Sequence, residues 1–263
     1  MVTKTELDIL AAKYETEYFI KDDPVQFVHN YKDKSDIELA GFIASLFSYG
    51  ARKIFIKKLY ELFGYAEGNL SEYIKSGDFS LIIRRGFNYR FSKPEDIAEV
   101  LKVLSKLYNT SSGLSELFEF GWDTGNDIIK MMSVVVDYFY ANAASSRVRG
   151  LHYLLPNPGK GGAMKRMNMF LRWMVRKSAV DIGIWNFMGK DKLLIPLDVH
   201  VGRISREMSL LNRKNNDLNA VIELTNRLRR FDPRDPIKYD FAFFGKGIEN
   251  SLSKKSGIKK DAV

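Results

Sequence analysis

The chain has 263 residues, enough to bury a substantial hydrophobic core, and its 45% hydrophobic and 28% charged content is typical of a globular protein in water. It contains no cysteine, which excludes disulfides, thiolate catalysis, cysteine-based zinc sites and iron–sulfur clusters, and no apolar run long enough to span a membrane. A net charge of +9 with 13% aromatic residues suits a nucleic-acid partner, although many other proteins are basic.

Helical periodicity dominates the first half of the chain, where apolar residues recur three and four apart. Helices are predicted over residues 7–18, from Asp23-Pro24 onward, over 36–63 with a break at Gly50, within 70–83, from Pro94, after the SSG at 111–113, and over 127–140. Between them, RRGFNYRF (84–91) is predicted to be a basic-aromatic loop. It is either a solvated connector or, through Arg84 and Arg85, a contact to DNA phosphate.

The segment 155–176, LPNPGKGGAMKRMNMFLRWMVR, joins a turn rich in proline and glycine to an amphipathic helix. Gly159, Gly161 and Gly162 free backbone N–H groups near a helix N-terminus, which is a favourable place for an anion. A polar stripe lies opposite the apolar face of this helix. It is either a solvated basic face or a surface that meets a ligand, and it consists of Lys165, Asn168, Arg172 and Arg176.

An apolar approach, LLIPL, leads to Asp198, and an amphipathic helix follows. Aspartate is among the best N-cap residues, so Asp198 is predicted to cap this helix. The carboxylate either serves only as a cap or also points into a cleft. His200 does not indicate a metal site, because the chain has three histidines and no paired ligand is evident.

Two more helices complete the predicted fold. One covers 217–230, and the other follows Asp235-Pro236 and is expected to end at Gly247. Asp240 and Phe244 lie one turn apart in the last helix. No segment shows sustained period-two alternation, so an all-α protein with few or no strands is predicted.

The glycine-bearing turn, the helix that opens with Lys165 and the PLDVH element (196–200) together resemble the helix-hairpin-helix DNA glycosylase superfamily. The separation of Lys165 and Asp198 is closest to that in the archaeal 8-oxoguanine glycosylase branch. The second half also resembles an uncharacterised bacterial family of conserved hypothetical proteins. The resemblance is strongest from Pro156 to Gly247.

The resemblance implies roles for individual residues. Lys165 matches the nucleophile of the bifunctional members, and Asp198 matches the catalytic carboxylate. Asp240 and Phe244 match the base pocket of the archaeal branch. The segment FIASLFSYGARKI (42–54) is similar to the early helix and the turn that wedges into the duplex. DNA contacts are therefore expected at Tyr49, Arg52, Gly159, Gly161, Gly162 and Arg172.

Two departures from the family pattern concern the site itself. The usual hairpin, an apolar residue followed by Pro-Gly-x-Gly, is replaced here by LPNPGKGG. The lysine helix reads KRMNM where an aromatic residue would help to sandwich a base. The absence of cysteine excludes the iron–sulfur subgroup.

The resemblance implies a single two-lobed helical unit over residues 1–250, with a cleft between the lobes. One lobe covers about 52–160, the other 1–51 plus 161–250, and a basic disordered tail covers 251–263. The expected function is excision of a damaged base, such as an oxidised purine, from double-stranded DNA, with AP-lyase activity through a Schiff base on the lysine. The alternative is a helical DNA-binding protein that kept the fold and lost the chemistry. We expect a cytoplasmic, nucleoid-associated monomer without cofactor or metal and without a membrane partner.

Overall fold

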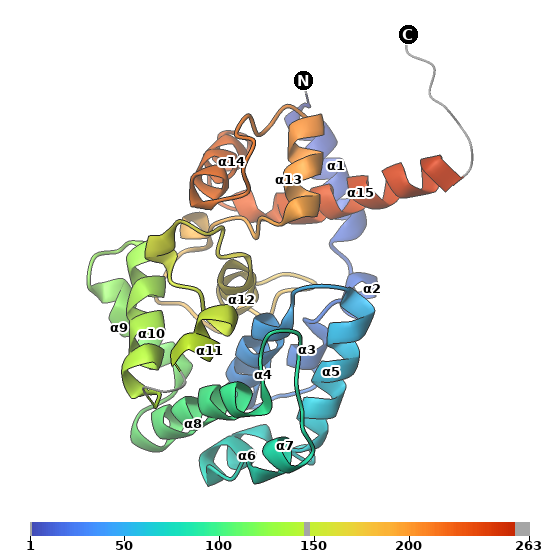
Figure 1. Ribbon diagram of the computed structural model, residues 1–263. Helices are drawn as coiled ribbons and strands as arrows, with labels where there is room; N and C mark the ends of the chain where they lie inside the picture. The colour runs from blue at the N-terminus through green and yellow to red at the C-terminus, as the bar shows by residue number, and fades with distance from the viewer. Residues whose placement is uncertain (1, 145–147, 256–263) are drawn as a thin grey trace.

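The computed structural model describes residues 2–144 and 148–255 (Figure 1). Helices account for most of this part of the chain. They are α1 (Lys4–Tyr14), α2 (Glu17–Ile20), α3 (Gln26–His29), α4 (Lys34–Phe47), α5 (Arg52–Gly64), α6 (Leu70–Ser76), α7 (Ser80–Arg84), α8 (Pro94–Thr110), α9 (Leu114–Asp123), α10 (Ile128–Asn142), α11 (Val148–Leu154), η1 (Pro158–Lys160), α12 (Lys165–Val175), η2 (Lys190–Lys192), α13 (Val199–Glu207), α14 (Leu218–Phe231), η3 (Pro236–Tyr239) and α15 (Asp240–Lys255).

The all-α prediction is confirmed for the described residues. Extended pairing in them is limited to isolated bridges, such as the one that joins Gly162 to Asp217. Gly50 has φ +86° and separates α4 from α5, as the sequence predicted, because glycine adopts this backbone conformation without strain. None of the described helices has both the length and the apolar character needed to cross a membrane.

The helices form two groups with α12 between them (Figure 1). One group contains α1, α13, α14 and α15, so that the first helix of the chain packs against the last. The other contains α3 to α11, where α9 packs on α10 and where α6 and α7 pack on α8. Helix α12 packs on α4. The division into lobes at residues 51 and 160 remains a prediction.

The hydrophobic core explains why α12 holds its position. Phe170 is fully buried and meets the ring of Phe42 from α4 at a centroid distance of 5.3 Å. Trp173 is also fully buried, and Trp185 donates from its indole N–H to the carboxylate of Glu38 at 2.8 Å. Both tryptophans therefore belong to the core.

The last helix differs from its prediction at its C-terminal end. Gly247 does not end α15, which continues to Lys255. A Cβ atom at residue 247 would overlap the imidazole of His200, so the glycine is explained by a close approach between α15 and α13. The first five residues of the expected tail, 251–255, thus belong to α15, and residues 256–263 lie outside the described part of the chain.

Candidate functional site

Helix α12 follows a turn whose backbone N–H groups form hydrogen bonds within the turn itself. The amide of Gly159 donates to the side chain of Asn157 at 2.8 Å, and the amide of Gly161 donates to the carbonyl of Pro158 at 2.9 Å. These two N–H groups are therefore not available to a phosphate in this conformation, contrary to the expectation. Gly162 is exposed and lines a cavity. Met164, with φ +50°, then directs the chain into α12 so that Lys165 is its first residue.

Asp198 caps α13, as the sequence predicted. Its Oδ1 atom accepts the backbone N–H groups of His200 and Val201, each at 2.9 Å. Its Oδ2 atom lies 3.3 Å from the Nζ atom of Lys165. The two oxygens of one carboxylate thus serve different partners, and the carboxylate is more than a helix cap.

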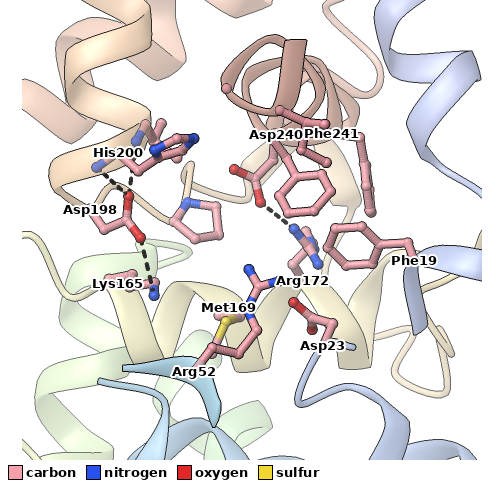
Figure 2. Close-up of a pocket in the computed structure, with 15 residues that line it drawn as sticks. Phe19, Asp23, Arg52, Lys165, Met169, Arg172, Asp198, His200, Asp240 and Phe241 are labelled. Atoms are coloured by element: carbon pink, nitrogen blue, oxygen red, sulfur yellow. Dashed lines mark hydrogen bonds and ion pairs between the residues drawn. The ribbon is translucent and has the colours of Figure 1, made fainter. Parts of the chain in front are cut away.

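Lys165 and Asp198 lie side by side, joined by this contact (Figure 2), and the pair lines two cavities. The first, of about 380 Å³, we call the aromatic cavity. The second, of about 480 Å³, we call the turn cavity, because Gly162 and neighbouring residues of the turn before α12 line it. The two side chains are 32% and 37% exposed, so a ligand can reach the pair from solvent.

Phenylalanine rings form one side of the aromatic cavity. The ring of Phe19 meets those of Phe241 and Phe244 edge-on, at centroid distances of 5.1 Å and 4.7 Å. The guanidinium of Arg52 lies 5.5 Å from the centroid of Phe244. Met169 of α12 also lines the cavity. Such a wall suits a flat apolar ring.

Carboxylates and an arginine form another side of the aromatic cavity. The guanidinium of Arg172 lies between the carboxylates of Asp240 and Asp23 and pairs with Asp240 (Figure 2). Burial raises the pKa of Asp240 to about 6, against the opposing effect of Arg172 and with a further contribution from the charge of Asp198. Burial likewise raises the pKa of Asp23, again opposed by Arg172.

The two arginines of the polar stripe form a buried charge network, whereas Lys165 at its start is partly exposed. Arg172 is 2% exposed and Arg176 is 3% exposed, and both bind the fully buried carboxylate of Asp181, at 3.1 Å and 2.9 Å. Arg176 also binds Asp235 at 2.9 Å and pairs with Glu15 of the segment after α1. Burial and these ion pairs hold Arg172 in the wall of the aromatic cavity, and its contact with DNA remains a prediction.

The electrostatics of Asp198 favour an ionised carboxylate. Burial alone would raise its pKa, but the charge of Lys165 and the backbone N–H groups of Val201 and His200 outweigh burial. The pKa of Asp198 therefore lies below its ordinary value. The site thus holds a fixed negative charge beside an amine.

The structure brings most of the predicted site residues to these two cavities. Lys165 and Asp198 line both cavities, and Tyr49 and Gly162 line the turn cavity. The aromatic cavity is also lined by Arg52, Arg172, Asp240 and Phe244. Gly159 and Gly161 line neither cavity. Sequence reasoning assigned no site role to Phe19 or Asp23, and it considered His200 only as a metal ligand. The Asp23-Pro24 pair indicated only the start of a helix. Nothing in the sequence indicated that Asp23 lies near α12.

Within the described residues, no group of three His, Asp or Glu side chains is placed to hold a metal ion. Comparison with known protein families matches the chain to the family model DUF2400, which is described as a protein of unknown function. The match covers residues 23–249 and so includes every residue of the two cavities except Phe19. No curated protein and no solved structure matches the chain.

Proposed function

The chain belongs to the DUF2400 family, and we propose that it is a DNA base-excision glycosylase with AP-lyase activity. The observation that carries the proposal is the contact of Lys165 with Asp198 at the mouth of the aromatic cavity, 3.3 Å between Nζ and Oδ2. A lysine amine beside an ionised carboxylate, next to a cavity with aromatic walls, contains the groups that such a reaction needs.

In the proposed reaction the Nζ atom of Lys165, after losing a proton, attacks the anomeric carbon of the damaged nucleotide. The bond between carbon and nitrogen forms as the glycosidic bond breaks, and the base leaves with that electron pair and takes up a proton. The bond between C1′ and the ring oxygen then breaks, the oxygen takes the proton that the bound nitrogen gives up, and a protonated Schiff base results. Loss of a C2′ proton to water forms a double bond between C2′ and C3′ and expels the 3′ phosphate. Asp198 stabilises the positive charge that develops on the sugar, because its lowered pKa keeps it ionised.

The aromatic cavity would receive the base once it leaves the helical stack. Phe19 and Phe244 supply apolar ring surfaces, and Asp240 supplies acceptors for N–H groups of the base. The charge of +9 supports the approach of a DNA backbone, because phosphate contacts supply much of the affinity in such complexes. A flipped, oxidised purine is the proposed ligand.

The proposal is tested with a panel of duplexes that each carry one damaged base. Release of the free base is measured under single-turnover conditions. We expect the protein to release at least one oxidised purine, and the Lys165→Ala protein not to cleave the strand. Release without cleavage would assign a monofunctional glycosylase that uses Asp198 alone. Duplex binding without release from any substrate would contradict the proposal and favour the non-catalytic DNA-binding alternative.

A further inference from the structure

Two exposed aromatic rings stack on each other beside the turn cavity. Phe91, in the loop after α7, is 63% exposed, and Tyr153, near the end of α11, is 50% exposed. Their ring centroids are 5.3 Å apart and their planes are inclined by 25°. Because two large rings stack while remaining open to solvent, they offer a flat apolar surface that the fold does not cover.

Two arginines hold this aromatic pair next to the site. Arg166 directly follows Lys165 and donates to the carbonyls of Leu46, at 2.7 Å, and of Tyr153. Arg90 lies 5.9 Å from the ring of Phe91 and 5.7 Å from that of Tyr49, which lines the turn cavity. Tyr153 is thus tied to the second residue of α12, and Phe91 is tied to the edge of the turn cavity.

The charge around the pair favours an anionic ligand. In residues 2–144 and 148–255, no carboxylate forms an ion pair with Arg90 or Arg166, whereas Arg172 and Arg176 are fully paired with acids. Arg84, Arg85 and Lys93 are exposed in the same loop region. Arg166 is occupied by the two carbonyls, so the exposed Arg90 is the nearest cation open to a ligand. An aromatic surface with exposed cations at its edge is the arrangement on which unpaired nucleobases stack, the rings taking the base and the cations taking the phosphates.

We propose that the Phe91–Tyr153 pair is a stacking platform for an unpaired base of the bound DNA, the base left without a partner opposite the excised one. This inference rests on the proposed function, because it places the two strands on opposite sides of the Lys165–Asp198 pair. The damaged base enters the aromatic cavity, and the unpaired base lies on the platform beside the turn cavity. The basic-aromatic loop thereby contributes a base contact in addition to charge.

The test compares the affinity of the whole protein for two duplexes by fluorescence anisotropy. One carries a tetrahydrofuran abasic analogue opposite adenine, and the other is fully paired. Because stacking on an aromatic ring contributes about 1–3 kcal/mol per base, Phe91→Leu should weaken binding to the abasic duplex by about 5- to 150-fold. Binding to the paired duplex should change little. Phe120→Leu is a matched control, since Phe120 is also 63% exposed but lies in α9.

A second readout replaces the adenine with 2-aminopurine, whose fluorescence falls when it stacks. Quenching by the wild-type and Phe120→Leu proteins, with loss of quenching in Phe91→Leu and Tyr153→Leu, is the expected result. The platform would be overturned if Phe91→Leu lost equal affinity for both duplexes or lost affinity for neither. Absence of quenching by the wild-type protein would also overturn it. Self-association that is abolished by Phe91→Leu would assign the surface to contacts between copies and would also overturn it.

The two proposals fail separately. Selective binding and quenching without base release or Schiff-base trapping would leave the platform standing and remove the catalytic assignment. Trapping by a Phe91→Leu protein with unchanged affinity and unchanged quenching would keep the catalytic assignment and remove the platform. Because both rings are exposed, leucine at either position should leave the urea midpoint of unfolding close to that of wild type.

Discussion

Replacing Asp198 by asparagine separates its two roles. The Oδ1 atom caps α13 through two N–H groups at 2.9 Å, and the Oδ2 atom faces Lys165 at 3.3 Å. Asparagine keeps a side-chain oxygen for the cap and ranks with aspartate as an N-cap residue, but it carries no charge. We therefore expect Asp198→Asn to fold normally and to lose base release by at least about 100-fold.

The expected loss of stability follows from the same contacts. Removing the charge from a helix N-terminus costs about 0.3–1 kcal/mol, and removing a partly exposed ion pair costs about 0–1 kcal/mol. Asp198→Ala also removes the cap, which adds about 1 kcal/mol. Urea unfolding should thus rank the three proteins as wild type, Asp198→Asn and Asp198→Ala, in order of decreasing stability.

The pH dependence of this difference has a definite sign. Because the pKa of Asp198 is lowered in the folded protein, its ionised form stabilises the fold above the pKa of the unfolded chain, near 4. That contribution disappears as the pH falls further, so wild type and Asp198→Asn should converge in acid. Base release by Asp198→Asn at the wild-type rate would show that the Asp198 carboxylate acts only as a helix cap.

Two further predictions concern the buried charges. Asp181→Ala leaves Arg172 and Arg176 each without one buried partner and should lower the free energy of unfolding by about 3–5 kcal/mol in urea titrations. A loss below about 1 kcal/mol would contradict the network. The stability of Asp181→Asn should lie between those of wild type and Asp181→Ala. Burial raises the pKa of Asp240 to about 6. Between about pH 4 and pH 6 this carboxyl is therefore more protonated in the folded state than in the unfolded chain. Its contribution to the free energy of unfolding falls as the pH rises through that window. Urea titrations across the window should show this slope for wild type and a weaker one for Asp240→Asn, and equal slopes would show that Asp240 does not titrate there.

Features encoded by neighbouring residues could be predicted from the sequence. Asp198 caps its helix through its own side chain, as expected. Pro94 begins α8, and Gly50 separates two helices. Each of these depends on a few adjacent residues, so the sequence pattern carries the information.

Features that depend on distant partners could not be predicted. The helix stripe containing Arg176 has the same pattern whether it faces water or acids, and its burial follows from Glu15, 161 residues earlier in the chain, together with Asp181 and Asp235. Gly247 has the pattern of a helix end, yet it lies within α15 because the imidazole of His200 approaches there. The side of a helix that is buried is decided by the helices packed against it.

The proposed attack of the Lys165 amine on the sugar is tested by borohydride trapping on a duplex with an abasic site. We expect a covalent complex of protein and DNA whose attachment maps by peptide mass to Lys165, and whose formation is lost in Lys165→Ala. Lys160, an exposed lysine in the preceding turn, provides the control Lys160→Ala, which should still trap. An adduct that persists in Lys165→Ala, or no adduct with the wild-type protein, would contradict the claim.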